Sequence, residues 1–224
     1  SKGTFTDKIV AMQTIGKVTL TPGFRIGYVA TTDSDIIKDF CAKKQATDFG
    51  GSFFIQHAFA NYLLTPDQER EFNENVSLFE KRREVLLQEL KQFGYKPENN
   101  NIIVNNSGFY VSFEVPRSFQ GKRFPLSEFP KLLKGYPFIE KNIDGDLYKT
   151  LFEARGYIPA SELFVLELIK RTGINVLPGH LFCHVDKENP NQYENWVRLA
   201  LIRDEAELKD AFKRIRDNKE LFTW

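Results

Sequence analysis

A threonine, a lysine and an arginine stand close together near the start of the chain, in the segment TIGKVTLTPGFRIGY. Thr14 precedes Lys17 by three residues, and Arg25 follows it by eight. A lysine amine can form a Schiff base with an aldehyde once desolvation or neighbouring cations activate it. An arginine offers a planar fork of donors that matches two phosphate oxygens. Each residue alone is more simply explained as an exposed side chain, so it is their spacing that favours a functional role.

A second arginine stands among apolar residues near the end of the chain, in NWVRLALI. Strand alternation places Arg198 on one face with Trp196, Ala200 and Ile202. An unpaired buried charge is costly, so this arginine needs a partner. The residues leave two interpretations open, an anion that visits the site or an edge strand whose arginine pairs with a surface carboxylate.

Hydrophobic patterning predicts the elements that position the first group. Residues 9–12 form a continuous apolar run, which favours a strand buried on both faces, and residues 24–30 predict a second strand. Lys17 would then follow the carboxyl end of a buried strand, where open α/β sheets bind their ligands. Arg25 would lie just inside the second strand.

Helices are predicted after these strands. Asp33 or Ser34 caps a helix that Gly50 and Gly51 end, and the spacing of apolar residues predicts another helix at 55–63. A long helix follows at about 66–93, with Gly94 at the expected C-cap.

The remaining sequence predicts an α+β unit. Its elements are strands at 108–115, 174–177 and 196–202, a helix at 161–172 and a last helix that a capping box at Asp204 opens. Between 117 and 159 the pattern weakens, which predicts a loop-rich insertion with a short helix around 147–154. Two lobes that share the long helix fit this order.

The segment around Lys17 resembles the cofactor-lysine signature of class I/II aminotransferases, fold type I enzymes that use pyridoxal 5′-phosphate (PLP). That signature reads Ser or Thr, two residues, Lys, and a loop that closes in Gly-x-Arg-Ile/Val-Gly. Its positions are occupied here by Thr14, Lys17, Gly23, Arg25 and Gly27. The resemblance implies that Lys17 is the catalytic lysine that forms a Schiff base with PLP, while Thr14 and Arg25 hold the cofactor phosphate.

Other segments resemble the same family, in the family's order. KRREVLLQELKQFGY is similar to its interdomain helix, SGFYVSFEVP to its first small-domain strand, and RTGINVLPGHLFC to a loop near its active site. In NWVRLALI, Arg198 matches the arginine that clamps the substrate α-carboxylate. The resemblance implies an α/β fold, the C-terminal part of fold type I: residues 1–78 would end the large PLP-binding domain, and 79–224 would form the small C-terminal domain.

The resemblance also carries expectations about activity and assembly. Family members transaminate an amino acid and a 2-oxo acid, act as homodimers, and usually have nearly twice this length. The part that would precede residue 1 normally carries the aspartate that pairs with the pyridine nitrogen, an aromatic residue that stacks on the ring, and much of the phosphate site. We therefore expect this chain to need that N-terminal half and to be inactive alone.

Alternatives to transamination stay open, because a fold does not decide the reaction. One alternative is another PLP reaction on the same scaffold, of β-lyase or decarboxylase type. A non-catalytic aminotransferase-like domain that senses PLP is another, although no DNA-binding segment is present in these residues.

A zinc site is a further possibility, since several potential ligands lie close together in sequence: His180, Cys183, His184, Asp186 and Glu188. Structural zinc sites need four ligands with recognisable pairing, and Cys41 is remote from the group. We expect no metal here and interpret the segment as a loop after a strand, with His180 near the substrate pocket.

Composition restricts the class of partner. The formal net charge of +1 favours neither a nucleic acid nor an acidic membrane surface. No apolar run approaches the ~18 residues that a membrane-spanning helix needs. Two cysteines far apart fit a reducing compartment, and with no signal-peptide pattern at the start we expect a cytoplasmic protein.

Overall fold

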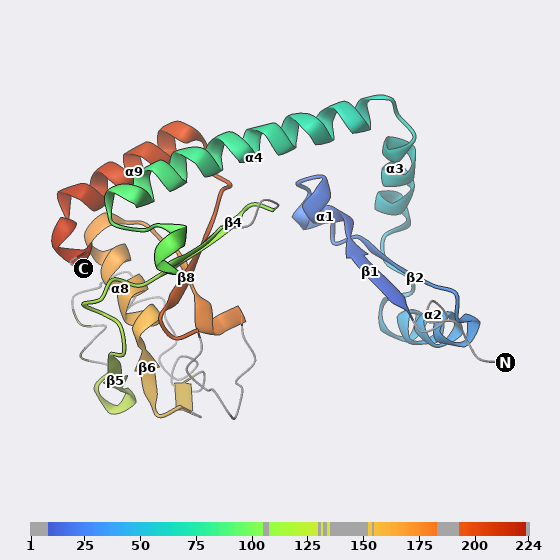
Figure 1. Ribbon diagram of the computed structural model, residues 1–224. Helices are drawn as coiled ribbons and strands as arrows, with labels where there is room; N and C mark the ends of the chain where they lie inside the picture. The colour runs from blue at the N-terminus through green and yellow to red at the C-terminus, as the bar shows by residue number, and fades with distance from the viewer. Residues whose placement is uncertain are drawn as a thin grey trace. The chain divides into compact units, whose positions relative to one another are not determined.

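The computed structural model describes residues 9–104, 108–129, 131, 134, 152, 153, 155–182 and 193–222. It is a mixed α/β structure (Figure 1) that divides into two compact units, Ser1–Ser77 and Leu78–Trp224. Among the described residues, no helix is both long enough and apolar enough to cross a bilayer.

The first unit begins with an antiparallel hairpin. Strand β1 (Val10–Thr14) pairs with β2 (Gly27–Thr31), in a register that runs from Val10 opposite Thr31 to Thr14 opposite Gly27. The connection holds a one-turn helix, α1 (Ile15–Val18), and a 3-10 turn, η2 (Pro22–Phe24).

Two expectations about this hairpin are wrong. The first strand was predicted to be buried on both faces, yet every residue of β1 is exposed, because within the described residues β1 pairs only with β2. Arg25 was expected inside the second strand. It lies two residues before β2, with a left-handed φ of 55°, a conformation that cannot continue a strand.

The two helices that follow begin and end where local signals predict. In α2 (Ser34–Asp48), the Asp33 side chain accepts hydrogen bonds from the backbone N–H groups of Asp35 and Ile36. Ser52 caps α3 (Phe53–Leu63) by accepting from Ile55 N at 3.5 Å.

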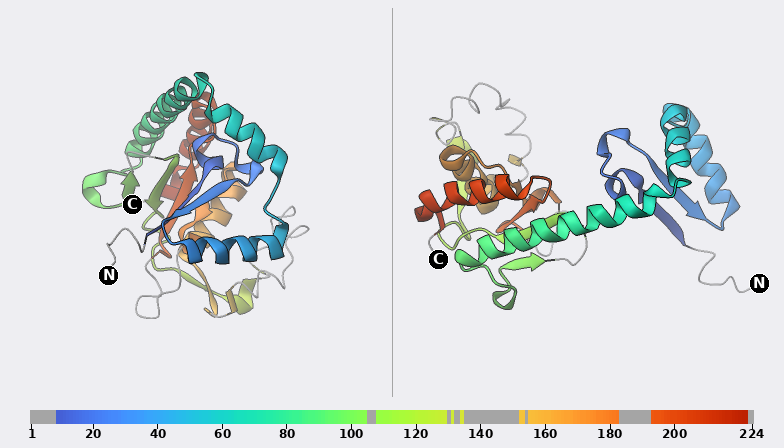
Figure 2. Two further views of the ribbon diagram at one scale, coloured as in Figure 1. Left: turned by 90° about the vertical axis from the view of Figure 1, so that its right-hand side faces the viewer. Right: turned by 90° about the horizontal axis from the view of Figure 1, so that it is seen from above.

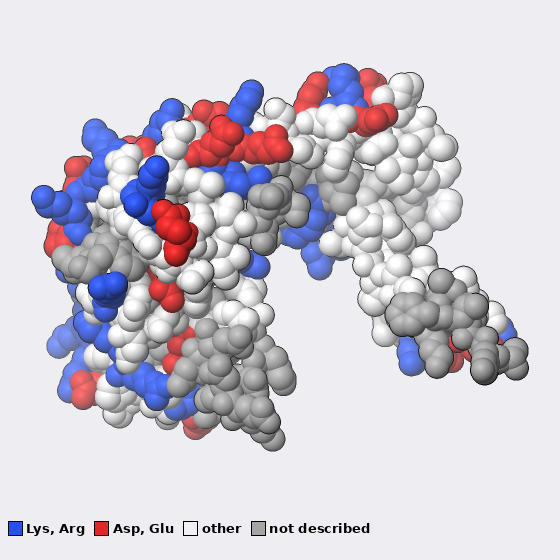
Figure 3. Space-filling model, viewed as in Figure 1, with Lys and Arg blue, Asp and Glu red and all other residues white. Residues whose placement is uncertain are grey.

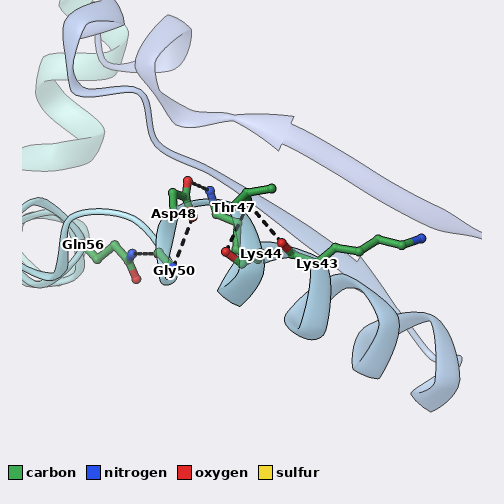
Figure 4. A network of polar contacts seen from close by, with 6 residues as sticks. All are labelled: Lys43, Lys44, Thr47, Asp48, Gly50 and Gln56. Atoms are coloured by element: carbon green, nitrogen blue, oxygen red, sulfur yellow. Dashed lines mark hydrogen bonds and ion pairs between the residues drawn. The ribbon is translucent and has the colours of Figure 1, made fainter.

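Polar contacts fix the turn between α2 and α3 (Figure 4). Asp48 at the end of α2 pairs with Lys44, and its Oδ1 accepts from Gly50 N at 3.2 Å. Gln56 of α3 donates to Gly50 O at 2.7 Å, and Gly50 itself has a φ of +97°. The glycine pair was predicted to end the helix; α2 ends just before it, at Asp48, and Phe49 takes the left-handed C-cap conformation with a φ of 56°.

Few apolar side chains of the first unit are covered. Among its described residues, Phe59 is the one large hydrophobic residue that is buried, while Phe53 is 77% and Phe54 is 87% exposed. Figure 3 shows uncharged atoms over most of the visible face of α3.

One long helix, α4 (Asp67–Gln92), matches the prediction of 66–93 closely, and the boundary between the units falls inside it. Gly94, with a φ of +83°, follows its end as expected.

The second unit is built on a four-stranded antiparallel sheet in the order β3-β4-β8-β7. Its strands are β3 (Ile102–Val104), β4 (Tyr110–Glu114), β7 (Leu177–Pro178) and β8 (Trp196–Ala200). Burial alternates along β4, as the sequence pattern predicts for a half-buried strand.

Three helices cover a hydrophobic core on this sheet: the end of α4, α8 (Ala160–Thr172) and α9 (Glu205–Asp217). Helix α9 lies alongside the C-terminal half of α4 (Figures 1 and 2), where Arg216 pairs with Glu89. The core residues include Leu86, Leu90, Val111, Phe113, Phe164, Leu168, Val197, Phe212 and Ile215. The predicted capping box of α9 is present between Asp204 and Glu207.

A smaller core lies against a separate two-stranded sheet. Strand β5 (Arg123–Pro125) pairs with β6 (Tyr157–Pro159), and the turn η4 (Leu126–Glu128) follows β5. Phe129, Phe152, Ile158, Leu163 and Leu166 pack there. These strands occupy both ends of the predicted insertion, whereas most of the predicted short helix at 147–154 lies outside the described residues. Three short turns complete the unit: η3 (Pro97–Asn99), η5 (Gly179–Phe182) and η6 (Lys219–Phe222).

Candidate active site

The hairpin of the first unit brings the ends of the lysine-containing loop together. Thr14 is the last paired residue of β1, opposite Gly27, and Ile15 N donates to Ile26 O at 3.0 Å. The Thr14 hydroxyl also donates to Ile26 O, at 3.2 Å. Thr14 is therefore a backbone neighbour of the segment that carries Arg25, although eleven positions separate the two in sequence.

Lys17 lies in the one-turn helix α1, directly after β1, and its side chain is exposed. Arg25 is exposed as well, and its Nη1 donates to Pro22 O at a long 3.4 Å. An amine, a hydroxyl and a guanidinium are thus presented from a single loop.

Two glycines of this loop allow close approaches of the backbone. A Cβ on Gly16 would lie 2.8 Å from Thr21 O, and a Cβ on Gly27 would lie 2.6 Å from Gln13 O. Neither distance is possible for a real side chain, so both positions need glycine.

An open cavity of about 860 Å³ borders the hairpin. Thr14 and Arg25 both line it, together with residues of β2 and α2 that include Tyr28, Phe40 and Lys44. Lys17 is not among the lining residues. The structure therefore groups Thr14 with Arg25 at one cavity and places Lys17 on the adjoining turn.

Arg198 belongs to the second unit, so it is not part of this group. It lies on β8 with Ser112 of β4 opposite it on one side and Leu177 of β7 on the other, which makes β8 an interior strand. The edge-strand interpretation of Arg198 is therefore wrong.

Two aromatic rings hold the Arg198 guanidinium. Its central carbon lies 3.4 Å from the ring centroid of Phe182 and 4.0 Å from that of Tyr110. Both rings therefore pack closely against the guanidinium. The Nε atom of Arg198 is buried with no hydrogen-bond partner among the described residues. A buried donor without a partner costs about 1–3 kcal/mol, and a bound anion would relieve that cost.

Sequence reasoning missed both rings. Tyr110 is predicted on a half-buried strand and Phe182 in a loop, and both expectations are correct, but neither indicates a contact with Arg198. The available signal was register: Tyr110 and Arg198 lie on adjacent strands, two positions apart along the pairing. An aromatic and a cation placed this way contact each other on one sheet face.

The zinc alternative is only partly covered by the structure. Of its residues, His180 is described, while Cys183, His184, Asp186 and Glu188 lie outside the described residues. Among the residues that are described, no cluster of three or more His, Cys, Asp or Glu side chains is placed to bind a metal.

Comparison with known proteins decides the family. The sequence profile described as aminotransferase class I and II matches residues 4–215. The chain belongs to the class I and II aminotransferases. The family predicted from the sequence is confirmed.

Two named relatives match over most of this chain. It is 27% identical over 196 residues to LL-diaminopimelate aminotransferase of Halothermothrix orenii, a match over 88% of this chain and 36% of the relative. It is 23% identical over 214 residues to aspartate aminotransferase of Sulfurisphaera tokodaii, over 94% of this chain and 41% of the relative. The chain thus spans about two fifths of the length of these relatives.

Solved structures share the fold. The crystal structure of an aromatic aminotransferase from Pyrococcus horikoshii matches with a TM-score of 0.67 at 16% identity, over 97% of this chain and 45% of that one. At this identity the likeness concerns the fold alone. The predicted fold class, an α/β chain that forms part of fold type I, is confirmed.

Proposed function

We propose that this chain supplies the cofactor lysine and the substrate-carboxylate arginine of a PLP-dependent aminotransferase, which exchanges an amino group between an amino acid and a 2-oxo acid. Family membership supports transamination in general. The observation that carries the residue assignment is the loop closure that makes Thr14 a neighbour of the Arg25 segment, with Lys17 on the turn between them.

The groups presented by this loop suit PLP. The cofactor carries an aldehyde and a phosphate, which call for an amine and for several hydrogen-bond donors. Lys17 provides the amine, and the Thr14 hydroxyl and Arg25 guanidinium both border the 860 Å³ cavity. Their present hydrogen bonds are to backbone carbonyls at 3.2 and 3.4 Å, so a phosphate would be the stronger partner for each.

Each residue then has a separate task. Lys17 Nζ attaches the cofactor, Thr14 Oγ1 and Arg25 bind its phosphate, and Arg198 binds the substrate α-carboxylate through its planar fork. When bound, PLP supplies the electron sink, and the protein supplies orientation and charge. Because the rings of Tyr110 and Phe182 already confine the Arg198 guanidinium, binding a carboxylate there requires little further ordering.

Assembly and substrate form part of the same proposal. The exposed apolar side chains of the first unit, such as Phe53 and Phe54, support a need for further protein surface, either an N-terminal half of the large domain or a second subunit in a homodimer. We accordingly expect no turnover by the 224-residue chain with added PLP. An exposed free cysteine, Cys41, supports a reducing compartment such as the cytoplasm.

The assignment of Lys17 is tested by trapping the cofactor. The intact protein is reduced with borohydride in the presence of PLP, digested, and mapped by mass spectrometry. The label is expected on the peptide that contains Lys17, and Lys17→Ala should abolish it. Lys44→Ala is the matched control, since Lys44 lines the cavity but pairs with Asp48. A label on Lys44, or one that survives Lys17→Ala, contradicts the proposal.

A further inference from the structure

A buried polar cluster in the second unit takes no part in the proposed function. It joins the first turn of α8 to the turn η5. Ser161 Oγ lies 3.1 Å from His180 Nδ1, and Glu162 Oε2 lies 3.8 Å from His180 Nε2. All three residues are buried, and Ser161 is completely so.

The surroundings of the cluster keep the histidine neutral. Burial lowers the pKa of His180 to about 4, and the positive charge of Arg155 contributes to that shift. Burial raises the pKa of Glu162 to about 7. The ring of Phe152 packs 5.5 Å from the imidazole. Glu194 also lies nearby: it accepts from Arg155 at 3.0 Å and, through its backbone carbonyl, from Ser161 N at 2.8 Å.

The same short turn that carries His180 also carries Phe182. Its first residue, Gly179, is pressed against β8: a Cβ there would lie 2.7 Å from Trp196 O and 2.9 Å from Trp196 Cβ. Its last residue, Phe182, stacks on Arg198 at 3.4 Å. Phe182 is itself 47% exposed.

We infer that His180 is a positioning residue for the carboxylate site: its hydrogen bond with Ser161 fixes the turn η5 and thereby holds Phe182 against the Arg198 guanidinium. Glu162 lies too far from Nε2 for a hydrogen bond, and Nε2 has no hydrogen-bond partner among the described residues. The inference rests on the proposed role of Arg198 in binding substrate. His180 touches neither substrate nor cofactor in this scheme.

The physical reason is that a turn of only four residues has few side chains that can fix it to the rest of the domain. It has one side chain directed to the core, His180, and one exposed ring, Phe182. Without a fixed point at His180, the turn could rotate about its contact with Trp196, and Phe182 would leave the guanidinium. A guanidinium stacked on one ring instead of two retains more freedom, so a carboxylate must order it on binding.

The variants follow from the geometry. His180→Asn keeps a polar group near the position of Nδ1, within reach of Ser161, whereas His180→Leu removes it and fills a similar space. Leu181→Ala is the matched control, because Leu181 lies in the same turn and is 54% exposed.

In the intact enzyme with PLP bound, His180→Leu should raise the Michaelis constants for both the amino donor and the oxo acid by roughly five- to twentyfold. We expect kcat to stay within about twofold and the PLP absorbance to be unchanged. His180→Asn should have Michaelis constants close to those of the wild-type enzyme, and Leu181→Ala should leave the Michaelis constants unchanged. A structural role alone would lower the amount of active enzyme and leave the Michaelis constants unaltered. Ser161→Ala, which removes only the partner of Nδ1, replaces His180→Leu if that variant does not fold.

A readout independent of activity separates this inference from the proposed function. In the 224-residue chain labelled with nitrogen-15, the Nε–H signal of Arg198 should be shifted by the two flanking rings. His180→Leu should move it toward the position found in Phe182→Leu, and the double variant should add nothing further. An unmoved signal in His180→Leu overturns the inference. A signal that moves while the Michaelis constants do not supports the positioning of Phe182 and rejects the carboxylate role of Arg198.

Discussion

The ring of Phe182 covers the guanidinium of Arg198 at 3.4 Å, from a turn whose own anchor is a buried histidine. The ring of Tyr110, one strand away in the same sheet, lies 4.0 Å from the central carbon of the same guanidinium. The two rings restrict the movement of the guanidinium, and its N–H groups lie in its own plane, so hydrogen bonds to a ligand form at its edge. An edge with parallel N–H groups matches a planar carboxylate.

Arg198→Lys should therefore weaken substrate binding and leave the cofactor in place. The charge is kept, but the fork and the stacking plane are lost, and losing one charge-assisted hydrogen bond costs about 1.5–3 kcal/mol. Apparent affinity should fall by roughly ten- to a hundredfold with normal PLP absorbance. Steady-state kinetics test this, with Arg203→Lys as control, since Arg203 is exposed and pairs with Glu207. Unchanged Michaelis constants for every amino acid and oxo acid tried would reject the role.

Gly27→Ala should damage the lysine loop, whereas Gly23→Ala should not. A Cβ on Gly27 meets Gln13 O at 2.6 Å, and the same atom on Gly23 meets nothing within 4 Å. Forcing β1 and β2 apart should cost about 1–3 kcal/mol of stability and separate Thr14 from the Arg25 segment. PLP affinity, measured by absorbance titration of the intact protein, should fall for Gly27→Ala alone. Equal affinities for the two variants would show that the hairpin does not set the phosphate site.

The buried pair Glu162 and His180 predicts opposite pH dependence in two variants. The folded protein keeps a proton on Glu162 that the unfolded chain releases, so this group lowers stability as pH rises from about 4.5 to about 7. The folded protein leaves His180 neutral while the unfolded chain protonates it, so this group raises stability as pH rises from about 4 to 6.5. In the wild-type protein the two effects largely cancel between pH 4.5 and 6.5.

Removing either partner should expose the effect of the other. Relative to wild type, Glu162→Gln should gain stability as pH rises through that window, and His180→Asn should lose it, each by on the order of 1–3 kcal/mol. Urea unfolding at several pH values measures both, and other titrating groups cancel in the comparison. Parallel profiles for all three proteins would mean that the two pKa values are not displaced in opposite directions.

Glu194→Gln should destabilise the second unit. The carboxylate is 7% exposed and accepts from Arg155 at 3.0 Å and from the Tyr157 hydroxyl at 2.7 Å. Among the described residues, an amide leaves the Arg155 guanidinium, itself only 15% exposed, without a counter-charge, and such a change costs about 3–5 kcal/mol. Glu128→Gln is the control, because its pair with Lys131 is exposed and should contribute less than about 1 kcal/mol. Similar unfolding midpoints for the two variants would contradict this prediction.

Helix boundaries were the part of the fold that the sequence predicted best. The cap at Asp33, the glycine after α4 and the capping box at Asp204 are signals contained within a few residues, and each is present in the structure. Burial of β1 was predicted wrongly because it depends on what packs against the strand, which an apolar run does not specify. The left-handed Arg25 was missed because closure of the loop, rather than the residue type, sets that conformation.

The residues of the candidate site, like the helix boundaries, could be predicted where the signal lies within a short segment, but not where it depends on distant contacts. The residues Thr14, Lys17, Arg25 and Arg198 were selected from the sequence because their types and spacing match a family signature. The contacts around Arg198 could not be selected this way, since Tyr110 and Phe182 reach it only through strand pairing and a distant turn. Short strands such as β5 and β6 also lack a pattern of their own and form only by pairing with each other.

Because β8 is an interior strand, we expect the backbone around Arg198 to open less readily than the backbone around Lys17. Amides of a strand paired on both sides and packed on a core exchange with solvent only when much of the domain opens, whereas an exposed hairpin opens locally at little cost. In amide hydrogen exchange on this chain, we expect the segment around Arg198 to be protected for far longer than the segment around Lys17. On warming, the lysine loop should therefore lose its conformation first, while the carboxylate site persists until the second unit unfolds.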